Sequence, residues 1–220
     1  MDTDVMYVTD ESVRQPLTRE PQPGGTIRYG DRFVLRSCAS VEPRFVSIVR
    51  RKAGKRVPSA LSVNAGLSGA GAQADAVWTF VPATRAKNRV GEPVSFGDAV
   101  RLQLFDYCGN YRLLAMGEAD SGSVTALRAP CARDLSTWFV ACTGALRADD
   151  QGQMLPSGPV NRYLRYGKDC YITLTQAGRY LCLTPAAQGT NSHGIGTLSD
   201  WPRTGLAIFW HADRCTDDAR

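Results

Sequence analysis

The sequence predicts an all-β protein built of about twelve short strands in three repeated units. A nine-residue pattern occurs three times along the 220 residues, and no stretch keeps a helical period of apolar residues. The 21 glycines and 12 prolines suit a chain with many turns and few helices. Short strands at this spacing are typical of a closed all-β body.

The repeated pattern reads aliphatic, any residue, aromatic, glycine, two further residues, apolar, any residue, aliphatic. It occupies residues 27–35, 94–102 and 164–172. Its glycines are separated by 67 and 70 residues, and they are Gly30, Gly97 and Gly167. We expect each glycine to lie in a turn that leads into a strand, where a positive φ favours this residue.

The residues after these glycines indicate how the turns are capped and which face is buried. Asp31 and Asp98 can accept backbone N–H groups. Lys168 takes this place in the third copy, and Asp169 beside it is the alternative cap. Alternation then puts one apolar set on the interior face, near one pseudo-three-fold axis. That set is Phe33, Leu35, Val100, Leu102, Cys170 and Ile172.

Three further strands are expected in each copy. The second strands are residues 45–48, 111–114 and 180–183, and the third strands are residues 60–63, 123–127 and 194–198. The fourth strands are residues 77–80, 137–140 and 207–210. When the three copies are aligned, Ile208 takes the position of Trp78 and Trp138. Because these positions repeat, we expect Trp78 and Trp138 to be core residues rather than platforms for stacking a sugar.

The glycine-led strand, the Tyr-Leu strand and the closing Trp or Phe strand together resemble a β-trefoil. Within that superfamily, the sequence pattern is most similar to MIR-domain and fascin-type repeats. The Gln-x-Trp signature of ricin-type trefoils is absent, because Ala76-Val77 and Ser136-Thr137 precede the tryptophans. The resemblance implies a single β-trefoil domain over residues 24–220. Its repeats span about residues 24–90, 91–158 and 159–213.

Residues 1–23 precede the repeats. Pro16, Pro21 and Pro23 favour an extended N-terminal arm over this segment, and a disordered tail is the alternative. An extended arm can lie across a neighbouring subunit and add strand-like contacts.

Charge and cysteine content narrow the class of protein and its compartment. The 26 Lys and Arg exceed the 21 Asp and Glu by five, a mild excess that disfavours a sequence-specific nucleic-acid binder. The seven cysteines include no Cys-x-x-Cys pair, and no apolar stretch reaches the ~20 residues of a membrane span. The N-terminus lacks the features of a signal peptide. We expect reduced thiols in an intracellular protein or one within an assembled particle; a secreted disulfide-bonded protein is the alternative.

A basic run falls on an expected hairpin tip after the second strand. Its members are Arg50, Arg51, Lys52, Lys55 and Arg56. A solvated loop is one interpretation, and an electrostatic contact for an acidic partner, a nucleic-acid backbone or an anionic surface is the other. No aromatic residue interrupts the run, so base stacking is not indicated.

A second candidate region lies between residues 191 and 203. It carries His193, Trp201 and Arg203. Trp201 is either a surface contact or a residue packed beneath the barrel rim. A catalytic triad through His193, or a zinc site through His211 and Cys215, would need partners that no local motif supplies.

We therefore predict a non-enzymatic interaction or structural protein, without a cofactor, that docks into a larger protein assembly. A minor or cement component of a virion shell and a scaffold adaptor both fit this description. The alternative is a glycan-binding lectin, and an enzyme or protease inhibitor is the third class. Specific recognition is expected where the repeats depart from symmetry, because the repeated positions maintain the fold.

Overall fold

The computed structural model describes fifteen segments of the chain. They are residues 25–40, 42–49, 60–67, 74–83, 89–106, 109–117, 122–128, 135–142, 145–148, 150, 154–157, 162–167, 170–186, 193–199 and 207–215. The predicted arm, residues 1–23, lies outside them and stays a prediction.

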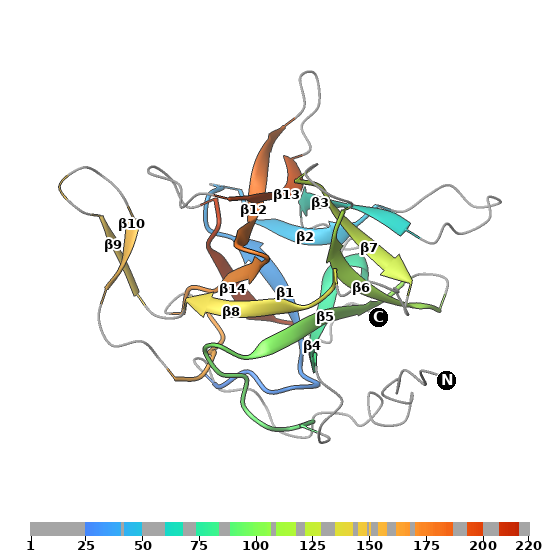
Figure 1. Ribbon diagram of the computed structural model, residues 1–220, viewed down its shortest axis with the longest axis horizontal. Coiled ribbons are helices and arrows are strands. Elements are labelled where there is room, and N and C mark those ends of the chain that lie inside the picture. Colours follow the sequence, from blue (N-terminus) through green and yellow to red (C-terminus); the bar gives the residue numbers. More distant parts are fainter. Residues whose placement is uncertain are drawn as a thin grey trace.

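Twelve strands form one antiparallel sheet, with four strands from each repeat (Figure 1). The first repeat contributes β1 (Arg32–Ser37), β2 (Arg44–Ile48), β3 (Ala60–Leu67) and β4 (Val77–Pro82). The second contributes β5 (Ala99–Phe105), β6 (Tyr111–Met116), β7 (Val124–Arg128) and β8 (Trp138–Cys142). The third contributes β11 (Thr173–Gln176), β12 (Arg179–Ala186), β13 (His193–Leu198) and β14 (Trp210–Arg214). The described residues contain no α-helix, only the short 3-10 turn η1 (Ala74–Ala76), so the all-β prediction is confirmed.

The first and fourth strands of the repeats close a barrel. β1 pairs with β4 and β14, β5 pairs with β4 and β8, and β11 pairs with β8. Two backbone hydrogen bonds between Ile172 and Trp210, of 2.8 and 2.9 Å, join β11 to β14. The ring of strands is thereby complete, which leaves no long unpaired edge among the described barrel strands.

The second and third strands form three hairpins that pair with one another. The hairpins are β2–β3, β6–β7 and β12–β13. β3 pairs with both β7 and β13, and Ser123 bridges Gly196 between the other two hairpins. A barrel closed by a triangle of hairpins is a β-trefoil, so the predicted fold is confirmed.

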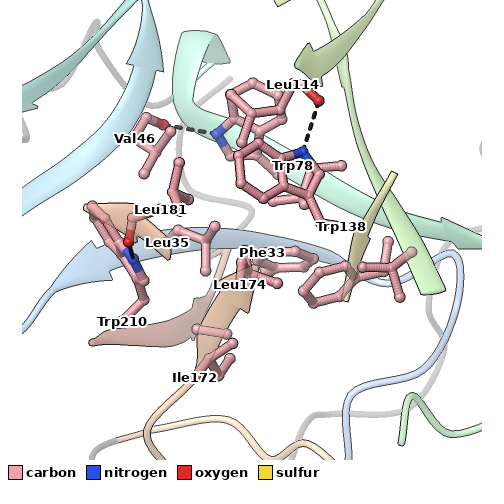
Figure 2. Packing of buried hydrophobic residues seen from close by; sticks show 14 of the residues in the cluster. Phe33, Leu35, Val46, Trp78, Leu114, Trp138, Ile172, Leu174, Leu181 and Trp210 are labelled. Carbon is pink, nitrogen blue, oxygen red and sulfur yellow. Dashed lines mark hydrogen bonds between the residues drawn. The ribbon is translucent and has the colours of Figure 1, made fainter. Parts of the chain in front are cut away.

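Three tryptophans anchor the hairpins to the barrel (Figure 2). Each is fully buried, and the indole N–H groups of Trp78, Trp138 and Trp210 donate to backbone carbonyls. The acceptors are Val46 at 2.7 Å, Leu114 at 2.9 Å and Leu181 at 3.1 Å. In the third repeat, the residue equivalent to Trp78 and Trp138 is therefore Trp210. The alignment that put Ile208 at this position was wrong by two residues. Because residues 207 and 208 form a turn before β14, Ile208 instead joins a separate small cluster.

The six residues expected in the barrel interior are all 0% exposed and belong to one core cluster. They are Phe33, Leu35, Val100, Leu102, Cys170 and Ile172. The rings of Phe33 and Phe80 stack at 4.5 Å between centroids, within the range preferred for aromatic pairs. The predicted register of the three copies is thus confirmed for the buried face.

The repeated glycines lie in left-handed turns, as predicted. Gly30, Gly97 and Gly167 have φ of 93°, 82° and 92°. The expected caps are also present, because Asp31 accepts the Arg28 amide at 2.9 Å and Asp98 accepts the Ser95 amide at 2.8 Å. In the third copy the Arg165 amide lies 3.4 Å from Cys170 Sγ, while Lys168 and Asp169 lie outside the described residues.

Each strand begins after its glycine turn. β1 and β5 begin at Arg32 and Ala99, and β11 begins later in its repeat, at Thr173. A positive φ redirects the chain, so the residues before each glycine pair with the equivalent residues of other repeats instead of continuing a strand.

One hairpin falls outside the trefoil pattern and was not predicted. β9 (Ala145–Ala148) and β10 (Met154–Ser157) form a separate two-stranded sheet within the range assigned to the second repeat. In Figure 1 this ribbon stands away from the barrel, on the left of the view.

Other structural expectations concern thiols and membrane spans. Among the described residues, Cys38, Cys170, Cys182 and Cys215 form no disulfide bond. Cys108 and Cys131 lie outside the described residues, and the side chain of Cys142 is not described, so their redox state stays a prediction. In the described part of the chain, no helix has the length and apolar character to cross a membrane.

Candidate binding surface at the base of the barrel

Most of the surface residues predicted from the sequence lie outside the described residues. These are Arg50, Arg51, Lys52, Lys55, Arg56, Trp201 and Arg203. The strands that flank the basic run do pair as a hairpin, with Ile48 opposite Val63. The expected hairpin context of the run is therefore present, and its role in binding stays a prediction.

His193 is described, and it belongs to the triangle of hairpins. It is the first residue of β13, lies opposite Ala65 of β3, and is partly exposed. Its Nδ1 atom is 3.1 Å from the Thr184 carbonyl, so this backbone contact orients the ring. Among the described residues, no carboxylate or thiol makes a hydrogen bond or ion pair with His193.

Three leading segments meet where β1, β5 and β11 begin, at what we call the base of the barrel. They are residues 25–29, 92–96 and 162–166. Their aliphatic residues form a ring of backbone hydrogen bonds, because Ile27 donates to Leu164, Leu164 to Val94 and Val94 to Ile27, each at 2.9 Å. All three side chains are fully buried. This ring closes the base and fixes the positions of the residues around it.

The aromatic residue of each leading segment faces the next repeat, across what we call a seam. The Tyr29 hydroxyl donates to Asp98 Oδ2 at 2.9 Å, and the Tyr166 hydroxyl donates to Asp31 Oδ2 at 3.0 Å. Burial raises the pKa of both tyrosines, and the neighbouring carboxylates raise it further. Two of the three seams are therefore closed by a tyrosine–carboxylate hydrogen bond.

Arginines complete these two seams. The Arg89 guanidinium lies 4.6 Å from the centre of the Tyr29 ring, and it also donates to Asp98 and Glu92. The hydrogen bond to Glu92 is the largest cause that raises the pKa of Arg89. Arg214 lies 4.4 Å from the centre of the Tyr166 ring. The charges and rings at both seams are thus engaged within the protein.

The third seam, between the second and third repeats, is different. Phe96 occupies the position that Tyr29 and Tyr166 hold in the other repeats. Its amide donates to the Arg162 carbonyl at 3.0 Å, and the two tyrosine amides make the equivalent hydrogen bonds. Phenylalanine has no hydroxyl, and the residue aligned with Asp31 and Asp98 is Lys168. The Phe96 side chain is 48% exposed, whereas Tyr29 is 1% and Tyr166 7% exposed. The pseudosymmetry of the base is broken at this seam.

Two exposed arginines lie on the leading segment that pairs with the segment of Phe96. Arg162 and Arg165 are both exposed, and Arg162 lies 5.4 Å from the centre of the Tyr163 ring. Tyr163 is itself 37% exposed and bridges Ser95, the neighbour of Phe96. Among the described residues, neither guanidinium makes a hydrogen bond or an ion pair. We call Phe96, Arg162, Tyr163 and Arg165 the third-seam surface.

Buried titratable groups occur elsewhere, and their contacts are structural. The Arg112 Nε atom donates to Asp106 Oδ2 at 2.8 Å, and both side chains are 0% exposed. Asp106 Oδ1 also accepts the Asn110 amide at 2.9 Å. This ion pair therefore holds the β5–β6 turn, and pairing offsets the cost of burying two charges.

A small apolar cluster beside β14 holds the other candidates for chemistry. It includes Cys38, Cys182 and Tyr171, and His211 packs on Tyr171 with 4.7 Å between ring centroids. Burial raises the pKa of the Cys38 thiol to about 12 and of the Cys182 thiol to about 11. Burial also lowers the pKa of His211. These thiols are protonated at neutral pH, which makes them poor nucleophiles.

In the segments that the structure describes, no group of three or more His, Cys, Asp or Glu side chains is placed to hold a metal ion.

Comparison with solved structures supports the fold. The SDF2-like protein from Arabidopsis thaliana is 14% identical, with a TM-score of 0.57, over 86% of this chain and 94% of that chain. The O-mannosyltransferase Pmt1-Pmt2 complex of S. cerevisiae is also 14% identical, with a TM-score of 0.57, over 95% of this chain and 28% of that chain. Type II water soluble Chl binding proteins are 8% identical, with a TM-score of 0.55, over 90% of this chain and 100% of that chain.

These similarities support a MIR-like β-trefoil, and at such identities they establish the fold alone. No protein-family model matches the chain, and the search of curated proteins returned no match. The fascin-type resemblance stays a prediction.

Sequence reasoning did not identify the third-seam surface. The repeated aromatic position was assigned to the fold, and the change from tyrosine to Phe96 was not singled out. A signal was present, because Phe96 replaces tyrosine and Lys168 replaces aspartate at aligned positions of the same repeat pattern. That these two positions belong to one seam became visible only in three dimensions.

Proposed function

We propose that this protein is a non-enzymatic β-trefoil module that docks into a larger protein assembly through the third-seam surface. The observation that carries the proposal is the exposed Phe96 ring, at the one seam where the repeat loses its tyrosine. The leading segment that pairs with it carries two exposed arginines, Arg162 and Arg165. Exposed aromatic and arginine side chains are the residue types most enriched at the centres of protein interfaces.

The rigidity of the base supports this proposal. The closed ring of backbone hydrogen bonds through Ile27, Val94 and Leu164 fixes the backbone that carries the surface. A pre-organised surface loses less conformational entropy when it binds, which favours docking. Burial raises the pKa of Cys38 and Cys182, which argues against these two thiols as nucleophiles.

The assembly itself is proposed as a class only. A minor or cement component of a virion shell and a scaffold adaptor both use a compact barrel with a specific contact face.

The test is isolation of the full chain from its native source under mild conditions, followed by size-exclusion chromatography with mass detection. We expect a complex of fixed stoichiometry that contains a second protein. A chain recovered alone, together with one competable sugar class on a glycan array, would contradict the proposal and support a lectin.

A further inference from the structure

We infer that the third-seam surface binds a protein segment that places carboxylates beside an apolar side chain. This inference rests on the proposed docking function and names the chemistry of the partner. The apolar side chain would cover Phe96, and the carboxylates would pair with Arg162 and Arg165.

The apolar half of the surface is Phe96. It is 48% exposed, while the equivalent Tyr29 and Tyr166 are 1% and 7% exposed. An aromatic ring held this far into water gains free energy when a partner covers it, since buried apolar area contributes roughly 25 cal/mol per Å². Tyr163, 37% exposed and bridged to Ser95, adds a second exposed ring on the facing segment.

The charged half is Arg162 and Arg165. The three carboxylates described at the base are already engaged. Asp98 accepts from Tyr29 and Arg89, Asp31 accepts from Tyr166, and Glu92 pairs with Arg89. Neither Arg162 nor Arg165 makes an ion pair with a described residue, so an incoming carboxylate meets positive charge. The guanidinium fork matches a carboxylate in two parallel hydrogen bonds.

The same geometry disfavours a sugar. Hydroxyl groups of a sugar need acceptors as well as donors, and the guanidinium group offers donors only. The carboxylates that would serve as acceptors, Asp31 and Asp98, are used by Tyr166 and Tyr29. The surface therefore fits an acidic, partly apolar peptide better than a neutral glycan.

The chain offers a matched control for the aromatic residue. Phe139, in β8, is 47% exposed, nearly the same as Phe96. It lies on the barrel wall opposite Ala99 and Thr175, and it is not part of the leading segments. Phe139→Ala removes an equally exposed ring and leaves the third-seam surface intact.

The experiment measures binding of labelled synthetic peptides to the full chain by fluorescence anisotropy. The probes are an acidic peptide with Leu and Phe among its Glu and Asp residues, its Gln/Asn counterpart, and an acidic peptide with Ser in place of Leu and Phe. We expect the first probe to bind most tightly and its affinity to fall as salt is raised. Phe96→Ala and Arg162→Ala/Arg165→Ala should each weaken it about tenfold or more, as for interface anchors, and Phe139→Ala should not.

Circular dichroism and thermal unfolding establish that each variant is folded. Arg162→Lys gives a second variant at the same position, because lysine keeps the positive charge but lacks the forked guanidinium group. Equal binding of the Gln/Asn peptide, equal weakening by Phe139→Ala, or no binding of any peptide would overturn the inference. Tight binding of a neutral glycan that Phe96→Ala abolishes would also overturn it. If the native complex survives Phe96→Ala, the assignment of docking to the third-seam surface is wrong. The proposal that the protein docks into an assembly then stands, with another face as the contact.

Discussion

Replacement of Tyr29 by phenylalanine tests whether the tyrosine–carboxylate seams stabilise the barrel. The hydroxyl donates to Asp98 Oδ2 at 2.9 Å from a side chain that is 1% exposed. A hydrogen bond to a charged group contributes about 1.5–3 kcal/mol. Asp98 would keep the Ser95 amide at 2.8 Å and Arg89 at 3.2 Å, so it is not left unpaired. The lower part of that range, about 1.5–2 kcal/mol, is therefore expected.

The assay is reversible urea unfolding, compared with thermal unfolding. A loss of this size lowers the melting temperature by about 3–8 °C for a chain of this length. Tyr163→Phe is the control, since Tyr163 is 37% exposed and its hydroxyl should contribute within about 0.5 kcal/mol. Tyr166→Phe should resemble Tyr29→Phe, because its hydroxyl bonds to Asp31 at 3.0 Å. If Tyr29→Phe costs no more than Tyr163→Phe, the reasoning about the seams is refuted.

Three further predictions follow from burial. Because Tyr29 and Tyr166 have a raised pKa in the folded protein, they stabilise the fold fully below the unfolded pKa of about 10. This contribution to the free energy of unfolding is lost as pH rises above that value. The double Phe variant should lose stability less steeply above pH ~10 in urea titrations; an unchanged slope would contradict this. Because burial lowers the pKa of His211, stability should fall as pH drops below about 6.5. The variant His211→Gln should show a flatter acid profile than the parent, and an equally steep one would contradict the assignment. Leu102→Ala, at a site that is 0% exposed, should cost about 2–5 kcal/mol by urea unfolding, and a cost near zero would argue against its place in the core.

The fold could be predicted from the sequence because local and repeated signals agree. Gly30, Gly97 and Gly167 fall where a positive φ is required, and that requirement recurs once per repeat. The apolar alternation after them, with Leu35 and Leu102 in the same register, then fixes which face is buried. Each signal depends on residues close together in the chain, so no long-range contact had to be known.

The β9–β10 ribbon could not be predicted in the same way. It has no equivalent in the other two repeats, so the repeat comparison carries no information about it. Its strands are four residues each, too short for a clear alternation, and Pro156 within β10 argues against a strand.

The third-seam surface was missed because a seam joins residues that are distant in sequence. Tyr29 and Asp98 are 69 residues apart, and Asp31 and Tyr166 are 135 residues apart. The sequence pattern gives the aromatic position but not the exposure of Phe96. The basic run at residues 50–56, by contrast, is visible in sequence as a charge cluster, and its role awaits a binding measurement.

Photo-crosslinking from position 96 tests most directly whether the broken seam is a docking surface. The change Phe96→p-benzoylphenylalanine keeps an aromatic ring at this site, and the same change at Phe139 provides the control. The full chain would be irradiated in its native source, and the crosslinked peptides sequenced by mass spectrometry. We predict crosslinks from position 96, and not from position 139, to one acidic segment of a second protein. Crosslinks that are the same from both positions, or that reach no acidic segment, would contradict the account.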